Sequence, residues 1–279
     1  MKIGRSRTLQ SAKYLEQRRK KNIFAGIVLF ACIFIVLSLV VFIFRLDTLQ
    51  ISTIGFSGVS NISIEELEQK VIESMQGNYL FLIPKSNIVF YSKDKIKNKL
   101  IESFKEFDSV SVKSSGLSSV IVSIVERRPN AIVCNGFKDD SLDNFENDNC
   151  LNVDSNGYVY SKVNEKDNND YPRYYLSSDS LISIGESLLN KEKFINLKSF
   201  VNDIKVSGIS VKGILIGDDG SYELYFKNFD GSTAVIYFDD KTPLTNTSSN
   251  FIAFWNASSK KNFDYINLRF GNNIFYADR

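Results

Sequence analysis

The longest uninterrupted apolar stretch of the chain covers residues 23–44 and contains no charged residue. At about 1.5 Å per helical residue it reaches roughly 33 Å, which is enough to cross a hydrocarbon core of about 30 Å. A lone apolar span in lipid must satisfy its backbone hydrogen bonds internally, so we expect a helix. A buried core helix and a cleavable signal peptide are the alternatives, but residues 42–47 offer no small-x-small cleavage site. The pattern predicts a retained transmembrane helix.

The charges on the two sides of this stretch are unequal. The residues before it include one acid, Glu16, and many bases: Lys2, Arg5, Arg7, Lys13, Arg18, Arg19, Lys20 and Lys21. Only Arg45 and Asp47 follow it closely. Because basic flanks stay on the cytoplasmic side, we expect residues 1–22 to form a cytoplasmic tail and the rest of the chain to be exported. A basic tail can also bind nucleic acid, but a short one beside a span is more typical of a topology signal.

Hydrophobic spacing after the anchor predicts the order strand, helix, helix, strand, strand. Ser63 and the glutamates that follow it fit a capping box, and apolar residues then recur at helical spacing. The expected elements are a strand over 49–56, a helix from 63, a short apolar segment over 79–83, a helix from 92 or 94 to about 104, and strands over 110–113 and 120–126.

The pattern after residue 126 predicts mainly short strands. Asp219-Gly220 and Asp230-Gly231 separate alternating apolar runs, which is a strong hairpin signal. Residues 135–149 are rich in Asp and Asn and are expected to form an exposed loop. We expect strands over 131–134, 150–153, 158–161, 171–176, 209–216, 222–226, 234–238, 263–270 and 274–276, with helices within 186–206 and over 243–256.

The sequence contains no histidine, which removes Ser-His-Asp and Cys-His catalysis and His-ligated metals. Two of the three cysteines, Cys134 and Cys150, lie beyond the anchor, at the end of one predicted strand and the start of another. If those strands pair, the two Cβ atoms reach the roughly 3.5–4.5 Å that a disulfide requires, and an oxidising compartment preserves the bond. We predict the disulfide; two unrelated small core residues are the alternative.

Two motif matches are too incomplete to indicate chemistry. Ser92–Lys95 and Ser258–Lys261 match the Ser-x-x-Lys of penicillin-binding enzymes, but Pro243 follows Lys241-Thr242 where that chemistry needs glycine. The run over 152–157 imitates a calcium loop but lacks the glutamate at its twelfth position. We therefore expect no catalytic, cofactor-binding or metal-binding residues.

Considered together, several features resemble the FtsQ/DivIB family of bacterial cell-division proteins. These are the basic tail, the single span, the strand-helix-helix-strand-strand order, and three sequence runs: Glu126-Arg127-Arg128-Pro129, Val153-Asp154-Ser155-Asn156-Gly157 and Tyr265-Ile266-Asn267-Leu268-Arg269-Phe270. The resemblance covers nearly the full length in order and topology. Asn267 departs from the family, which commonly has Asp there, and so does the long loop between the two cysteines.

The resemblance implies an α+β fold with a single N-terminal transmembrane helix, a POTRA domain (βααββ) over 48–126, and a mostly antiparallel β domain with flanking helices over 127–279. It implies a non-enzymatic scaffold of the divisome, with its N-terminus in the cytoplasm, located in the cell (inner) membrane at the division septum. The implied partners are two bitopic coiled-coil proteins, FtsL and FtsB (DivIC in Gram-positives), and the implied role is to recruit and regulate septal peptidoglycan synthesis. No nucleic acid is implied.

The resemblance also implies a binding site, where a partner chain adds as a strand to the C-terminal edge of the β domain. The matching partner-binding positions are Arg269, Phe270, Gly271, Ile274, Phe275 and Tyr276. The alternative is that they are ordinary core and surface residues of a terminal hairpin. An exposed strand edge of the POTRA domain, at 110–113 or at 120–125, is a second candidate, and the sequence does not choose between the two. The alternative is that this domain is a spacer that packs near the membrane.

Two other classes of protein remain open at this point. One is a POTRA-containing factor for envelope assembly or secretion, although an outer-membrane insertase would carry a C-terminal β-barrel and no inner-membrane anchor. The other is a membrane-anchored cell-wall enzyme, which the missing histidine and the incomplete motifs disfavour.

Overall fold

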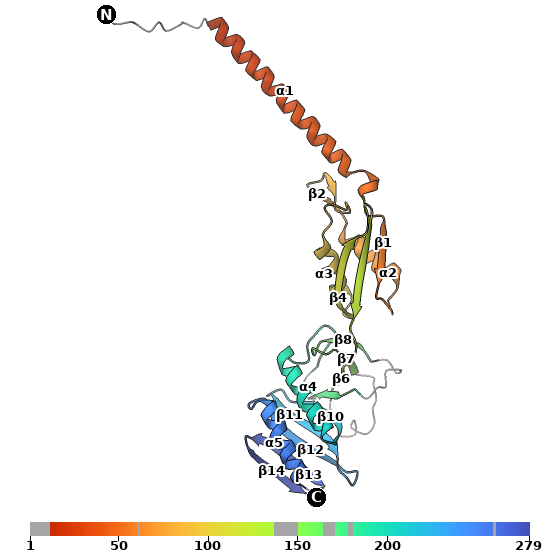
Figure 1. Cartoon of the computed structure of the whole chain (residues 1–279), viewed down its shortest axis with the longest axis vertical. Coiled ribbons are helices and arrows are strands. Elements are labelled where there is room, and N and C mark those ends of the chain that lie inside the picture. Colours follow the sequence, from red (N-terminus) through yellow and green to blue (C-terminus); the bar gives the residue numbers. More distant parts are fainter. Residues whose placement is uncertain (1–11, 61, 137–149, 164–170, 178–180, 259–260) are drawn as a thin grey trace, which may run out of the picture. The chain divides into compact units, whose positions relative to one another are not determined.

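A computed structural model describes residues 12–60, 62–136, 150–163, 171–177, 181–258 and 261–279. The fold is α+β, as predicted: a long apolar N-terminal helix, a small mixed sheet with two helices, and a nine-strand, mostly antiparallel sheet with two further helices (Figure 1). Internal contacts divide the chain into two units, Met1–Glu102 with Val110–Ile124, and Ser103–Ser109 with Val125–Arg279.

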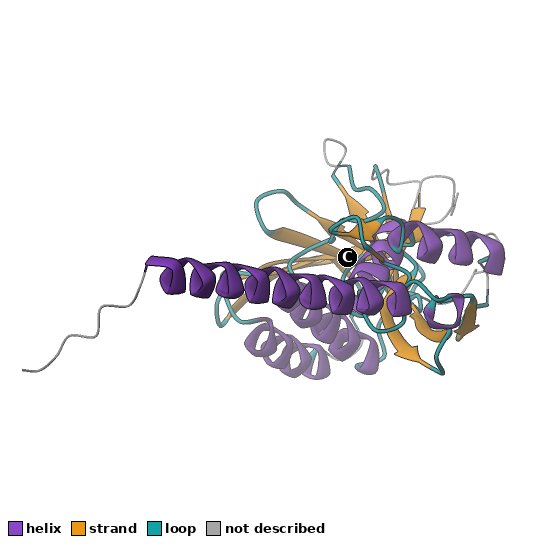
Figure 2. Cartoon of the chain, turned by 90° about the horizontal axis from the view of Figure 1, so that it is seen from above, coloured by secondary structure: helices purple, strands orange, loops and turns teal. Residues whose placement is uncertain are grey.

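The first element, α1 (Ala12–Phe44), is one continuous helix (Figure 2). It begins before the predicted transmembrane span, because the basic residues ahead of Ile23 are also good helix formers and Lys20 pairs with Glu16 at 3.0 Å, one turn away. Within the described part of the chain it is the one helix long and apolar enough to cross a membrane, over Glu16–Phe44. Its length and position suit a single-pass anchor or a signal sequence.

The first unit has the predicted order of strands and helices after the anchor. Its elements are β1 (Thr53–Ser57), α2 (Ile64–Ser74), β2 (Asn78–Tyr79), β3 (Ile83–Pro84), α3 (Lys93–Ser103), β4 (Phe107–Ser114) and β5 (Ser119–Glu126). The small sheet has the order β1-β5-β4, with β1 parallel to β5. Two details differ from prediction. Strand β1 starts later than expected, because a single 3-10 turn occupies Asp47–Leu49 and the backbone of residues 49–51 bonds to residues 86–88 instead of to the sheet. The short apolar segment is a small hairpin, β2–β3.

The two helices of this unit form where capping and apolar spacing predict. Ser63 Oγ accepts a hydrogen bond from the Glu66 amide at 3.1 Å, which caps α2 as expected. Each helix then buries two residues four positions apart, Leu67 and Val71 on α2 and Ile96 and Leu100 on α3. These four side chains are fully buried, so the stripe of each helix faces a packed core.

The second unit carries the large sheet, whose strand order is β14-β13-β12-β11-β10-β9-β6-β7-β8. Every strand and both helices lie where the sequence predicts, within a few residues. The elements are β6 (Ala131–Cys134), β7 (Cys150–Val153), β8 (Val159–Lys162), β9 (Arg173–Leu176), α4 (Lys191–Val206), β10 (Ser210–Ile216), β11 (Ser221–Lys227), β12 (Thr233–Asp239), α5 (Leu244–Ala257), β13 (Phe263–Phe270) and β14 (Asn273–Asp278).

Both helices of the second unit are crossover connections. Neighbouring strands β9 and β10 are parallel and α4 joins them, and β12 and β13 are parallel and joined by α5. A parallel pair needs such a long connection, whereas short turns join the antiparallel pairs β7–β8, β10–β11, β11–β12 and β13–β14. Strands β6 and β9 form a third parallel pair, and the other five pairings are antiparallel.

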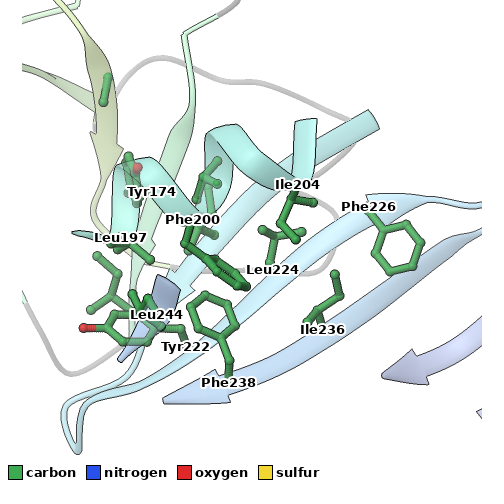
Figure 3. Close-up of a cluster of buried hydrophobic side chains, with 14 of the residues drawn as sticks. Tyr174, Leu197, Phe200, Ile204, Tyr222, Leu224, Phe226, Ile236, Phe238 and Leu244 are labelled. Carbon is green, nitrogen blue, oxygen red and sulfur yellow. The ribbon is translucent and has the colours of Figure 1, made fainter. Parts of the chain in front are cut away.

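The main core lies between these helices and one face of the sheet. Figure 3 shows Leu197, Phe200 and Ile204 of α4 over the strands. The Phe200 and Phe238 rings are 4.4 Å apart between centroids. Along β11 every second residue is buried, from Tyr222 to Phe226, as expected for a strand with one covered face. The core therefore holds the helices against the sheet and fixes its register.

Tyr174 on β9 is the largest polar exception in this core. Its side chain is fully buried, and its hydroxyl has no hydrogen-bond partner among the described residues. Burial raises the pKa of this hydroxyl above that of an exposed tyrosine. The group therefore lowers the stability of the folded state at neutral pH and does so more strongly in alkali.

Replacing Tyr174 with Phe should increase the free energy of unfolding at neutral pH by about 1 kcal/mol, because it removes an unpaired buried hydroxyl. The pKa of Tyr174 is raised on folding, so the unfolded state releases this proton first, and stability falls as the pH rises above about 10. Tyr174→Phe should therefore lose less stability in alkali than the wild type. Urea titrations in detergent at about pH 7 and at about pH 11 measure both effects.

The matched control is Tyr265→Phe, at a partly exposed position on β13. It should leave the free energy of unfolding at neutral pH close to that of the wild type. A Tyr174→Phe variant that is markedly less stable at neutral pH would show that the hydroxyl is in fact well paired.

Candidate functional site

Strand β14 forms one end of the nine-strand sheet. It pairs with β13 on one side, with Ile266 opposite Tyr276 and Asn267 opposite Phe275. On its other side, no strand pairs with it among the residues that the structure describes. This end of the sheet is also the C-terminal end of the chain (Figure 1). A row of backbone amides and carbonyls therefore faces outward without strand partners.

The sequence of β14, Asn-Ile-Phe-Tyr-Ala-Asp, contains neither lysine nor proline, the residues that usually protect an exposed edge. Its register with β13 is regular where Tyr265–Asn267 oppose Ala277–Phe275 and shifts on either side of that stretch. The end of the strand is held by an exposed ion pair between Lys261 and Asp278 at 2.8 Å, and Asp278 raises the pKa of that lysine. An added strand would meet its most regular backbone over residues 275–277.

The opposite end of the sheet, β8, is partly covered by the chain itself. The Val159 amide donates to the Glu186 carbonyl at 2.9 Å, and the Gly185 amide donates to the Val159 carbonyl at 2.8 Å. A bridge between Tyr158 and Ser187 extends this contact. The strand also ends in Lys162. Of the two ends, β14 is therefore the one open to another chain.

Four of the six predicted partner-binding residues lie at or near the turn of the β13–β14 hairpin. Phe270 and Phe275 are 54% and 53% exposed, and their rings meet edge to face at 5.0 Å. Gly271 takes a φ of +65° in the turn between the strands, a conformation that favours glycine. The Arg269 guanidinium lies 5.3 Å from the centroid of the Tyr237 ring, and its Nε donates to Asn267 Oδ1 at 3.1 Å.

The other two predicted residues, Ile274 and Tyr276, contribute to packing. The Tyr276 ring lies 5.1 Å from Phe254 of α5 and 5.7 Å from Phe263 of β13. Ile274 is half-buried against the main core. Both therefore help to attach the terminal hairpin to the helix-covered face, although the Tyr276 ring remains partly exposed.

Sequence reasoning missed two tyrosines beside this site. Tyr237 on β12 and Tyr265 on β13 have ring centroids 6.3 Å apart, on the face opposite the helices. Burial and the nearby Glu223 raise the pKa of Tyr237, and Arg269 opposes them. Alternation along these strands could have placed both residues on the outer face, but the parallel pairing of β12 with β13 that brings them together has no local signal.

Two of the sequence runs that carried the family resemblance meet at a buried corner of the second unit. Arg127 forms an ion pair with the buried Asp154, and its guanidinium lies 4.4 Å from the Tyr158 ring centroid. Asp154 Oδ1 also accepts from the amides of Asn156 and Tyr158, at 2.7 and 3.0 Å. The run that imitates a calcium loop is therefore a tight turn fixed by its own aspartate.

Gly157 completes that turn. Its φ is +88°, and a Cβ atom at this position would lie 2.8 Å from Phe194 Cγ on α4. Glycine is needed here both for the backbone conformation and for the close approach of the helix.

The predicted cysteine pair joins β7, at its other end, to the neighbouring strand β6. Strands β6 and β7 are antiparallel, and their register places Cys134 opposite Cys150, with a Cα–Cα distance of 4.1 Å. The structure joins the two in a disulfide. The loop that the bond would close, predicted over 135–149, lies largely outside the described residues.

The remaining sequence candidates have structural roles in the described chain. Ser92 Oγ accepts from the Lys95 amide at 3.3 Å, and Ser258 Oγ donates to the Trp255 carbonyl at 2.7 Å, so both serines serve helix ends. The predicted strand edge over 120–125 is wrong as a docking site, because β5 lies between β1 and β4. The edge that includes residues 110–113, on β4, is an end of the small sheet.

The chain matches no protein-family model and no curated protein. The functional interpretation therefore rests on the residues and geometry described above. Among the described residues they comprise the outer edge of β14, with which no strand pairs, and the exposed aromatic side chains beside it.

Alkylation of the exported protein tests the disulfide. With Cys134 and Cys150 bonded, an alkylating reagent should modify only Cys32 in denatured protein, and two further thiols should react after reduction. Mass spectrometry counts the additions. A Cys134→Ser variant is the control and should show one extra reactive thiol without reductant. Three reactive thiols in the unreduced wild type would contradict the bond.

Proposed function

We propose that this protein is a membrane-anchored scaffold of bacterial cell division, of the FtsQ/DivIB type, that works by binding other proteins. Helix α1 would be its single transmembrane anchor, with the basic tail in the cytoplasm and the rest of the chain exported. The strand and helix order of the small sheet, β1-α2-α3-β4-β5 with a short hairpin inserted, supports a POTRA domain. The large sheet would be the partner-binding β domain.

The observation that carries this proposal is the unpaired edge of β14. A strand edge without lysine or proline is a liability for a soluble surface, because it can pair with any exposed strand. A dedicated partner removes that liability. The extracytoplasmic segment of a bitopic FtsB- or DivIC-like protein, itself associated with an FtsL-like protein, is the partner that the family resemblance implies.

Strand addition would divide affinity and selection between backbone and side chains. The partner's backbone would extend the nine-strand sheet by hydrogen bonding to β14, which supplies affinity without regard to sequence. Phe270 and Phe275 offer exposed rings beside that edge, and Arg269 supplies a positive charge next to Tyr237. Aromatic and arginine side chains of this kind commonly dominate interface energies.

Holding such a partner beside the membrane would serve assembly of the septal machinery. The scaffold needs no catalytic residue for this task, because it acts by concentrating membrane proteins at one place. Recruitment and regulation of septal peptidoglycan synthesis would then follow from which proteins the complex retains.

Binding of the partner's extracytoplasmic segment to the full chain tests the site. Phe270→Ala and Phe275→Ala should each raise the dissociation constant about tenfold, because exposed aromatic contacts with the partner are lost. This change equals about 1.4 kcal/mol of binding free energy. Isothermal titration calorimetry, or surface plasmon resonance with the partner segment immobilised, measures the dissociation constants. Tyr276→Ala should weaken binding and also lower the melting temperature, because its ring packs on Phe254 and Phe263.

Phe229→Ala is the matched control. Phe229 is 56% exposed, about as much as Phe275, but it lies in the turn between β11 and β12, and its ring stacks on Trp255 of α5 instead of standing beside Phe270 and Phe275. It should bind like the wild type. Equal affinities for wild type, Phe270→Ala and Phe275→Ala would remove the C-terminal edge as the binding site.

A further inference from the structure

The tip of the β2–β3 hairpin exposes two large apolar side chains that nothing in the described chain covers. Leu80 and Phe81 are 87% and 91% exposed, the highest values among the large apolar residues that the structure describes. Leu82 beside them is about half exposed. Single exposed apolar residues are ordinary on protein surfaces, but a contiguous group of this kind marks a contact with another phase or molecule.

The backbone at the tip is also strained. Leu80 and Phe81 have φ values of +47° and +61°, in the left-handed region that residues with a branched or bulky side chain rarely adopt. They are the only residues other than glycine with positive φ in the described chain. Glycine or asparagine would fit this turn at lower cost. A leucine and a phenylalanine there indicate that their side chains have a use that offsets the strain.

The tip is tied to the C-terminal end of α1, the helix proposed to cross the membrane. Arg45, the first residue after α1, donates from Nε to the Leu82 carbonyl at 2.8 Å and from Nη2 to the Phe81 carbonyl at 3.3 Å. The tip therefore lies within the reach of one side chain from the end of α1, which would be the depth where the bilayer meets water if α1 spans it. Arg45 also satisfies two backbone carbonyls, which an environment poor in water requires.

A second set of contacts fixes this arrangement. Asn87, which is fully buried just after the hairpin, donates to the carbonyl of Phe44 at 2.8 Å, and Gln50 donates to the same carbonyl at 2.9 Å. The rings of Phe44 and Phe90 meet edge to face at 4.9 Å. These side chains satisfy a carbonyl of the last helical turn and hold the hairpin against it.

The residues that border the tip suit a membrane interface. Lys85 lies 5.9 Å from the centroid of the Tyr79 ring, at the base of the hairpin. With Arg45 it provides two positive charges beside the apolar tip, where the phosphates of a leaflet would lie. Tyrosine and basic residues are typical of this level of a bilayer, with apolar side chains below it.

We propose that the β2–β3 hairpin inserts Leu80 and Phe81 into the outer leaflet beside α1, as a second lipid contact of the small-sheet unit. The inference rests on the proposed role of α1 as a membrane anchor. Lipid is the occupant that the contacts favour, because Arg45 holds the tip at the end of the span and two bases flank it. Anchor and hairpin together would restrict rotation of this unit about the helix axis.

Site-directed spin labelling of the full chain in liposomes of phosphatidylethanolamine and phosphatidylglycerol tests the insertion. A nitroxide is placed singly at Phe81→Cys or at Ile64→Cys, both in a Cys32→Ser background, or at the native Cys32. Ile64 is the matched control, because it is also an exposed apolar residue of the same unit. It lies at the start of α2, after the end of β1 that is farther along the chain from α1. The readout is the collision of each nitroxide with oxygen, which partitions into lipid, and with a polar nickel complex, which does not.

The oxygen-to-nickel collision ratio at position 81 should be several-fold higher than at position 64. Like the ratio at position 32, it should be in the range typical of lipid rather than water. If the collision ratio at position 81 equals that at position 64 while the ratio at position 32 is typical of lipid, the hairpin does not insert. That result would overturn the proposal but would still support α1 as the membrane anchor. Low collision with both reagents at 81 would show a protein cover and would also overturn it. A water-like ratio at 32 would instead show that α1 does not span the bilayer.

Discussion

The rest of this structure depends on one constraint: the backbone amides and carbonyls at the edge of a sheet need hydrogen-bond partners. A sheet of nine strands that does not close has two ends, and each leaves amides and carbonyls facing outward. The chain deals with one of them itself, by hydrogen bonds between Val159 and the segment at Gly185 and Glu186. On the outer side of the other, β14, no strand pairs among the described residues, and the strand contains neither lysine nor proline. That asymmetry is the basis for the proposal that another chain docks at β14.

The topology explains why the open end is also the end of the chain. Helix α5 carries the backbone from β12 across the sheet to β13, which lies parallel to β12 on the side away from β11. The turn at Gly271 then adds β14 antiparallel outside β13. Among the described residues no strand pairs with the outer side of β14, and the exposed rings of Phe270 and Phe275 lie beside that edge. Inner residues such as Tyr276 attach it to α5.

Much of this architecture could be predicted from local patterns. The cap at Ser63, the turn signals at Gly220 and Gly231, and the alternation in β11 each act within a few residues, and the expected elements agree with the structure. The pairing of Cys134 with Cys150 followed from one hairpin. The parallel neighbours could not be predicted in this way, because pairs such as β12 with β13 depend on a helix packing across the sheet rather than on any turn.

The site was predicted less completely for the same reason. Arg269 and Phe270 were identified by resemblance, but Tyr237, which lies under the Arg269 guanidinium, comes from a strand joined to theirs through α5. The sequence predicts only a short apolar segment around Leu80 and Phe81. The hairpin tip itself could not be predicted, because neither its positive φ values nor its hydrogen bonds from Arg45 have a sequence signature.

Hydrogen exchange of the backbone amides is the most direct test of the central claim, because strand addition is an event of the backbone. Exchange of the full chain would be followed with and without the partner's extracytoplasmic segment. The account predicts that amides of Asn273–Asp278 exchange more slowly in the complex, while those of Val159–Lys162 at the other end of the sheet are unchanged. Unchanged exchange in β14 on a complex that demonstrably forms would contradict it.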